Sequence, residues 1–285
     1  MHTLLISPAE LQTLMASGQR LCVFDCSFEL MNPEAADTLF AEVHIAGAQQ
    51  AHLDRDLSAH SAAEAVNGGR HPLPRREVVA AWLGRMGVDA QTQVVVYDRN
   101  GCNYCGRLWW MLKWLGHEAV AVLDGGLQAW QAAGGATESG AAQAVTACEF
   151  AVRPPLRALM DTTTVHTRLR QPAQTVVDAR GAPRYRGEVE PLDPIAGHIP
   201  GALNRPFNEN FGPDGRFKSA DQLRAEWLAV LGSRAPESVV HQCGSGVSAV
   251  PNLIAMELAG LGATALYAGS WSEWSRTPGL PCEKG

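Results

Sequence analysis

The residue best suited to chemistry in this sequence is Cys243, which follows a short β-branched run at 239–240. A glycine-interleaved loop comes next, and the apolar segment 250–261 then reads as a helix, so the cysteine lies where a strand gives way to a helix. Gly244 and Gly246 allow the backbone to adopt positive φ and to fold tightly. Successive N–H groups in such a loop converge on an anion, and the helix N-terminus adds its positive end. This environment stabilises a thiolate, which makes Cys243 a candidate nucleophile.

The loop has two other interpretations. A free cysteine beside a turn is often only a small core residue, but the glycines and serines that follow Cys243 favour a reactive thiolate. A cysteine phosphatase also places a thiolate in an amide-lined loop, yet it needs an arginine six residues later to hold the phosphate. Ala249 stands at that position, so a phosphoryl transition state lacks its main charge partner.

Composition sets the class of protein. The 285 residues are 46% hydrophobic and 18% charged, which is typical of a globular protein of two domains or one large one. A net charge of −6 argues against nucleic acid or an anionic membrane as a partner, and no apolar run is long enough to span a bilayer. The N-terminus lacks the features of a secretion signal. Seven cysteines without framework spacing indicate reduced thiols in a cytoplasmic protein.

Apolar periodicity and capping residues predict alternating strands and helices. At the first helix, Ser7 and Glu10 form a capping box, with Pro8 at the first helical position. Strands are expected at 4–6, 21–25, 94–97, 119–123, 176–178 and 239–241, and helices at 8–15, 34–42, 77–86, 106–115, 127–133, 161–170 and 250–261.

The pattern occurs twice, which predicts a tandem duplication of α/β units, each a parallel sheet with helices on both faces. An offset of 144 relates Trp130 to Trp274 and Gly125 to Gly269, and the same offset places Arg99 opposite Cys243. The first domain therefore lacks the cysteine, and one active site is expected, in the second. The expected domains are 1–137 and 158–285, with an Ala/Gly/Thr-rich linker at 138–157.

Four segments accompany the Cys243 loop in a fixed order, at 124–127, 177–180, 197–202 and 269–274. Together with that loop they resemble the two-domain rhodanese-like sulfurtransferases that use 3-mercaptopyruvate or thiosulfate. In that family the cysteine takes a sulfane sulfur from a donor, becomes a persulfide and passes the sulfur to an acceptor such as cyanide or a thiol, including thioredoxin. The resemblance implies no metal and no organic cofactor. It also implies that loop amides hold the persulfide, here those of Gly244, Ser245, Gly246, Val247 and Ser248.

The donor is the open question. The uncharged Gly244 and Ser245 resemble the 3-mercaptopyruvate branch, whereas the thiosulfate branch carries cationic residues there, which suit a dianion. The resemblance implies that Arg184 binds the donor's anionic group. A second family arginine is missing near 192–193, and Arg186 is the candidate substitute, so thiosulfate stays open as the alternative.

The resemblance also implies a proton relay of Ser245 with His71 and Asp54, which could manage the thiol proton of the donor. The alternative is that these are an ordinary loop histidine and a surface acid. A non-catalytic rhodanese module used for binding is the non-enzyme alternative to the whole assignment, and the intact Cys243 loop argues against it.

Other conspicuous residues are expected to be structural. Cys102 and Cys105 form an isolated C-x-x-C without the second pair that zinc needs, so incidental cysteines are favoured over a redox pair. His44 and His198 occupy equivalent turns, which predicts a side-chain bond to backbone. His241 is expected to pack in its strand.

Overall fold

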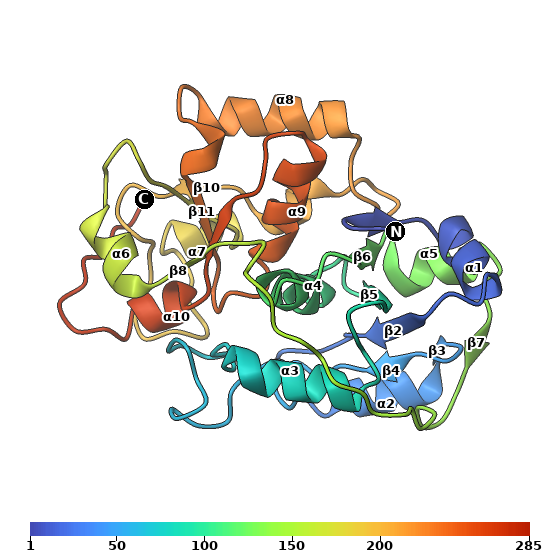
Figure 1. Cartoon of the computed structure of the whole chain (residues 1–285). Helices are drawn as coiled ribbons and strands as arrows, with labels where there is room; N and C mark the ends of the chain where they lie inside the picture. Colours follow the sequence, from blue (N-terminus) through green and yellow to red (C-terminus); the bar gives the residue numbers. More distant parts are fainter. The chain divides into compact units, whose positions relative to one another are not determined.

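The computed structural model describes residues 1–285, which form two compact units (Figure 1). The expected domains 1–137 and 158–285 are each continuous in sequence, whereas the two units of the structure are not. Segment Ala65–Leu73 groups with the second unit, and Pro213–Arg216 groups with the first. The first unit comprises Met1–Glu64, Pro74–Leu156 and Pro213–Arg216, and the second comprises Ala65–Leu73, Arg157–Gly212 and Phe217–Gly285.

The first unit contains a five-stranded parallel sheet in the order β1-β6-β5-β2-β4. A short antiparallel pair joins β3 to β7, at a place where the sequence predicted only a turn. The strands of the first unit are β1 (Leu5–Ile6), β2 (Leu21–Asp25), β3 (His44–Ile45), β4 (Gln49–Gln50), β5 (Gln93–Tyr97), β6 (Val120–Leu123) and β7 (Thr137–Glu138). Its helices are α1 (Pro8–Ala16), α2 (Ala35–Glu42), α3 (Arg76–Arg85), α4 (Cys105–Trp114) and α5 (Gly126–Ala132).

The second unit repeats the arrangement, with a parallel sheet in the order β10-β9-β11-β12-β8. The predicted duplication is thereby confirmed. Helix α8 was not predicted, although Ser219 caps it. The strands are β8 (Leu159–Met160), β9 (Thr175–Asp178), β10 (Leu203–Asn204), β11 (Val239–Gln242) and β12 (Ala265–Tyr267), and the helices are α6 (Thr162–Thr167), α7 (Ala182–Tyr185), α8 (Ala220–Leu231), α9 (Val250–Leu258) and α10 (Ser270–Trp274), with 3-10 turns η1 (Phe207–Asn210) and η2 (Pro236–Ser238).

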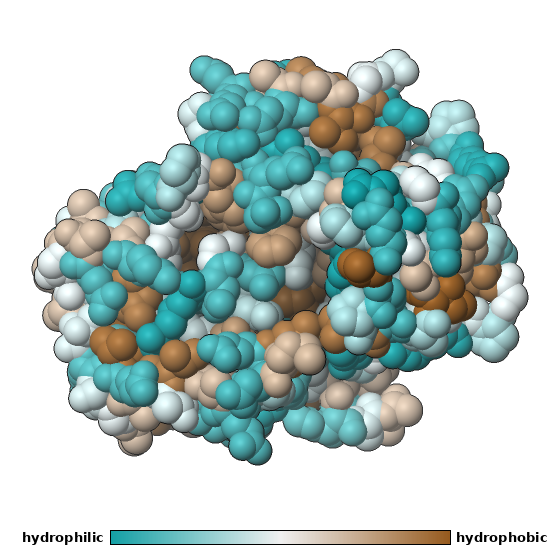
Figure 2. Space-filling model, turned by 180° about the vertical axis from the view of Figure 1, so that it is seen from behind, coloured by the Kyte–Doolittle hydropathy of each residue, from teal (hydrophilic) through white to brown (hydrophobic).

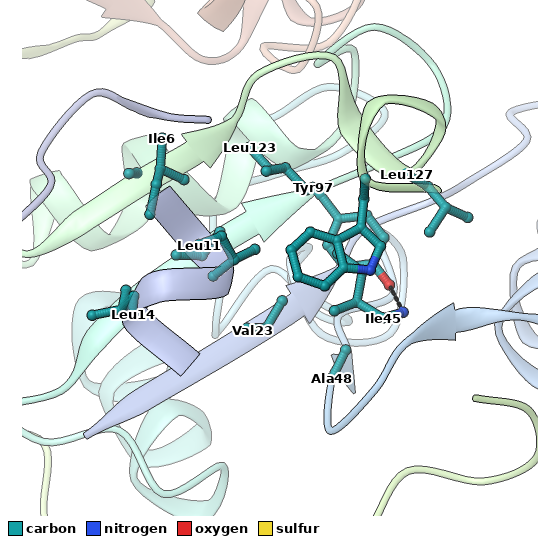
Figure 3. Close-up of a cluster of buried hydrophobic side chains, with 12 residues drawn as sticks. Ile6, Leu11, Leu14, Val23, Ile45, Ala48, Tyr97, Leu123 and Leu127 are labelled. Carbon is teal, nitrogen blue, oxygen red and sulfur yellow. Dashed lines mark hydrogen bonds between the residues drawn. The ribbon is translucent and has the colours of Figure 1, made fainter. Parts of the chain in front are cut away.

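Both faces of each sheet are covered by helices, because alternate strand residues point to opposite sides. In the second unit, Val240 faces Trp271 and Trp274 on one side, whereas Val239 faces Trp227 and Met256 on the other. In the first unit, residues of α1 and α5 pack around Tyr97, whose hydroxyl accepts a hydrogen bond from the Ile45 N–H at 3.0 Å (Figure 3). The other face carries Trp82 of α3 against Phe24, with ring centroids 5.5 Å apart. The predicted fold class is confirmed.

The segment expected as a linker, 138–157, packs for most of its length on the first unit. The Cys148 N–H donates to the Gly84 carbonyl at 2.9 Å, and the Arg153 N–H donates to the Leu115 carbonyl at 2.9 Å. A side chain at Gly84 would lie 2.5 Å from the Cys148 carbonyl oxygen, so the glycine permits this close approach. The segment is therefore anchored to the first unit by backbone hydrogen bonds, although most of its side chains are exposed.

The sheet register corrects the alignment of the two halves. Tyr97 pairs with Asp25 on the neighbouring strand, and Gln242 pairs in the same way with Asp178. The next residue along each strand is then Asp98 in the first unit and Cys243 in the second. The offset at this point is therefore one longer than expected, and Asp98 rather than Arg99 is the counterpart of the cysteine.

No helix in this chain is long and apolar enough to cross a membrane. Figure 2 shows hydrophilic residues spread over one face, with apolar residues in separate patches among them.

Candidate functional site

Cys243 directly follows the last residue of β11 and is 2% exposed. Its N–H donates to Ser270 Oγ at 3.1 Å, and its carbonyl accepts from the Trp271 N–H at 3.0 Å. The next carbonyl, that of Gly244, accepts from the Ser272 N–H at 2.8 Å. The first turn of α10 thus holds the backbone around Cys243, and the candidate nucleophile lies on fixed main chain.

The two glycines of the loop are needed for different reasons. Gly246 has φ +72°, and a Cβ there would lie 2.3 Å from the Ala268 carbonyl oxygen. Both conformation and space therefore require glycine. Gly244 lacks the positive φ, but a Cβ there would lie 3.0 Å from Arg70 Nη2 and 3.5 Å from Arg184 Nη1. Glycine at 244 keeps open a space lined by two guanidinium groups.

The corresponding loop of the first unit encloses the carboxyl group of Asp98. Asp98 Oδ1 accepts hydrogen bonds from the Asn100 and Cys102 N–H groups at 2.9 and 3.0 Å. Asp98 Oδ2 accepts from the Tyr104 and Cys105 N–H groups at 2.8 and 2.9 Å.

Gly101 of this loop has φ +65°, close to the value at Gly246. Burial nevertheless raises the pKa of Asp98, because desolvation outweighs the four bonds. In the first unit the loop is thus a cage of amides around Asp98, at the position that corresponds to Cys243 in the second unit.

Ser245 and His71 meet, as predicted. Ser245 Oγ and His71 Nδ1 form a hydrogen bond of 2.7 Å, and both side chains are buried. They come together because Ala65–Leu73 belongs to the second unit. Asp54 belongs to the first unit, where its N–H donates to His52 Nδ1 at 3.2 Å, and its part in a relay stays a prediction.

The two candidate arginines differ. Arg184 faces the loop and is held by Glu190 at 2.7 Å. Arg186 instead pairs with Glu188 at 2.6 Å, and both side chains are about half exposed. The hydrogen bond to Glu188 raises the pKa of Arg186. Because the Glu188 side chain is itself about half exposed, it holds the guanidinium at the surface. The structure does not place Arg186 with the loop residues, so it does not replace the missing second arginine.

Two further arginines stand beside the loop. Arg180 is buried, donates to the Gly197 carbonyl at 2.7 Å and lies over the Trp271 ring at 4.8 Å. Burial lowers the pKa of Arg180, but its carboxylate partners and the nearby Cys243 raise it further, so the net shift is upward. Arg70 was overlooked because the sequence placed it in an irregular segment of the other domain. Its signal was its position directly before His71.

His44 and His198 make the side-chain bonds to backbone that the sequence predicted. His44 Nδ1 lies 2.7 Å from the Phe40 carbonyl oxygen, and His198 Nδ1 lies 2.8 Å from that of Tyr185. His241 is fully buried and has no hydrogen-bond partner, and burial lowers its pKa to about 3. Burial also raises the pKa of the Cys105 thiol, so it is a poor nucleophile. No group of side chains in the chain could hold a metal ion.

Comparison with known proteins agrees with this geometry. The rhodanese-like domain family matches residues 7–133 and 161–277. The chain belongs to this family. A Pseudomonas aeruginosa protein named as a probable 3-mercaptopyruvate sulfurtransferase is 43% identical over 286 residues, which cover 98% of this chain and all of the relative. A Mycobacterium tuberculosis protein named for thiosulfate sulfurtransferase activity is 36% identical, covering 99% of this chain and 97% of the relative. The structure of 3-mercaptopyruvate sulfurtransferase from Leishmania major superposes with a TM-score of 0.79 at 31% identity, covering 96% of this chain and 74% of that one.

Proposed function

We propose that this protein is a sulfurtransferase that moves a sulfane sulfur from 3-mercaptopyruvate to a thiophilic acceptor through a persulfide on Cys243. The observation that carries the proposal is the position of Cys243 in a loop whose counterpart in the first unit directs four N–H groups at the carboxyl group of Asp98. A persulfide anion needs the same stabilisation from fixed N–H donors.

In the first half-reaction the Cys243 thiolate attacks the sulfur of the donor. An S–S bond forms, the C–S bond breaks, and its electron pair stays on carbon as the enolate of pyruvate. The proton of the donor thiol ends on that carbon, so pyruvate leaves and a persulfide anion remains. Ser245 and His71 form a hydrogen-bonded pair that is suited to carry this proton. Asp54 is the predicted third member of the relay.

In the second half-reaction the acceptor attacks the outer sulfur of the persulfide. The S–S bond breaks and its electrons return to Cys243 as a thiolate, so the cycle closes without a redox cofactor. Cyanide would leave as thiocyanate, and a thiol, such as one of thioredoxin, would leave as a persulfide. The acceptor used in the cell and the cytoplasmic location stay predictions.

The donor's charge distinguishes 3-mercaptopyruvate from thiosulfate, the second candidate. The loop presents amides and no cationic side chain after Cys243, which suits a donor with one carboxylate. Arg184 would bind that carboxylate, because it faces Gly244. Thiosulfate stays a candidate because one relative carries its name.

The test is steady-state transfer to cyanide with each donor in turn, alongside Cys243→Ser. We expect a higher kcat/KM with 3-mercaptopyruvate, a mass gain of one sulfur atom on the donor-treated wild type, and neither turnover nor mass gain in the folded variant. Turnover near wild type in Cys243→Ser would refute the mechanism. A higher kcat/KM with thiosulfate would leave Cys243 in place and overturn the donor.

A further inference from the structure

Asp193 is a buried carboxylate that organises three arginines of the second unit. Its side chain is 0% exposed, and its oxygens lie 3.0 Å from Arg70 Nη1, 3.3 Å from Arg184 Nη2 and 2.7 Å from Arg276 Nη1. A buried carboxylate with several guanidinium partners fixes where each of them can point.

Two of these guanidiniums meet over the loop. Arg70 Nη2 and Arg184 Nη1 lie 3.0 and 3.5 Å from the point where a Cβ at Gly244 would stand, one residue from Cys243. Each arginine binds Asp193 through its other terminal nitrogen, which is Nη1 in Arg70 and Nη2 in Arg184. The space above Gly244 is therefore lined by N–H donors from both arginines.

Arg70 has donors left for a ligand. Its Nη1 is taken by Asp193, whereas its Nε is buried without a hydrogen-bond partner in the protein. Its side chain is 22% exposed, so the group is neither sealed in nor free in solvent. A buried, unpartnered guanidinium N–H carries a desolvation cost that an anion would relieve.

The backbone beside Arg70 is also fixed in advance. The Arg70 N–H donates to Ser272 Oγ at 3.0 Å. Gly69 has φ +93°, and a Cβ there would lie 2.6 Å from that same oxygen, so only glycine allows the approach. The following residue, His71, bonds to Ser245. One short segment thus presents a cation and a proton carrier to the same loop.

We propose that Arg70 is a donor-binding residue, which together with Arg184 clamps the carboxylate of a 2-oxo acid donor above Gly244. This rests on the proposed function. The planar fork of each guanidinium matches a carboxylate, and two forks held by Asp193 form a site that an ammonium group could not reproduce. Asp193 is the positioning residue that keeps the two forks apart and aimed at the loop.

The experiment compares Arg70→Ala and Arg70→Lys with the matched control Arg276→Ala, which removes another guanidinium from the same carboxylate. The donors are 3-mercaptopyruvate and mercaptopropanone, which has the same thiol and ketone but no carboxylate. We expect Arg70→Ala to lower kcat/KM for 3-mercaptopyruvate by about 10- to 100-fold, mainly through KM, since one charge-assisted hydrogen bond is lost. For mercaptopropanone we expect less than about a threefold change, by the same principle.

Arg70→Lys should recover only part of the loss, and Arg276→Ala should stay within about threefold of wild type with either donor. Competitive inhibition by pyruvate should weaken in Arg70→Ala in parallel with the KM. If Arg70→Ala has a lowered Tm, Arg70→Lys, which keeps a charge beside Asp193, provides the same comparison.

Equal losses with both donors, or equal losses in Arg70→Ala and Arg276→Ala, would overturn the assignment and leave Arg70 with a structural role. A wild type that forms the Cys243 persulfide only from thiosulfate would instead refute the proposed donor. The two failures are therefore distinguishable.

Discussion

Replacing Gly246 by alanine tests whether the shape of the loop, and not only its cysteine, produces the activity. At φ +72° an alanine costs about 1–2 kcal/mol of stability relative to glycine. Its Cβ would also stand 2.3 Å from the Ala268 carbonyl oxygen, whereas ordinary contacts begin at 3.4 Å. The loop must therefore move by about 1 Å, and such crowding adds about 1–3 kcal/mol.

The same substitution in the first unit is the control. Gly101 has φ +65°, but no atom lies within 4 Å of a Cβ built there. Gly101→Ala should thus lose about 1–2 kcal/mol in urea unfolding and keep its activity. Gly246→Ala should lose about 2–5 kcal/mol, from strain and crowding together.

The activity of Gly246→Ala should fall by about 100-fold in kcat/KM, because a shift of about 1 Å misaligns the amides and the sulfur. The assay is thiocyanate formation from 3-mercaptopyruvate and cyanide, at a temperature where both variants are folded. A kcat/KM within threefold of wild type in Gly246→Ala would refute the claim that the loop amides are aligned on Cys243.

Three further predictions follow from the site and the core. Ser245→Ala should lower kcat with 3-mercaptopyruvate by about 100-fold but leave transfer from a preformed persulfide to cyanide unchanged, since only the first half-reaction moves the thiol proton; equal losses in both half-reactions, measured by rapid mixing, would contradict this. If Asp54 completes the relay, Asp54→Asn should affect the same half-reaction alone, and an unchanged kcat would remove it from the mechanism. The pKa of His241 is about 3 in the folded protein, below its value in the unfolded chain. The contribution of His241 to the free energy of unfolding is therefore complete above pH 6.5 and falls as the pH drops toward 3, by about 1.4 kcal/mol per pH unit. His241→Leu should flatten the fall in free energy of unfolding between pH 6.5 and 5, and an equal slope in both proteins would argue against a buried neutral imidazole.

Much of the fold follows from local pattern. Strands β2 and β5 and the cap at Ser7 could be predicted because short continuous apolar runs and capping residues act within a few positions of one another. The Cys243 loop could be predicted for the same reason, since it is a contiguous signature, and the duplication could be predicted because such local signatures occur twice in the same order. Helix α8 was missed although its buried Leu223, Trp227 and Leu231 recur at helical spacing.

The site was only partly predictable. Spacing along the chain placed Arg99 opposite the cysteine, but the hydrogen-bonded register of β5 put Asp98 there. Arg186 and Arg184 are two residues apart and look alike in sequence. Their roles separated because Glu188 holds the first at the surface and Glu190 holds the second at the loop.

By itself the sequence determined that the chain is a doubled α/β protein with one glycine-rich cysteine loop, because apolar runs, capping and glycine placement are local. Only the tertiary structure decided that Arg70 and His71 belong with that loop. Their placement depends on contacts of the 65–73 segment with residues about two hundred positions away, Ser245 and Ser272 among them. Local spacing in the sequence does not specify these contacts, because they arise from side-chain packing and hydrogen bonding within the folded unit.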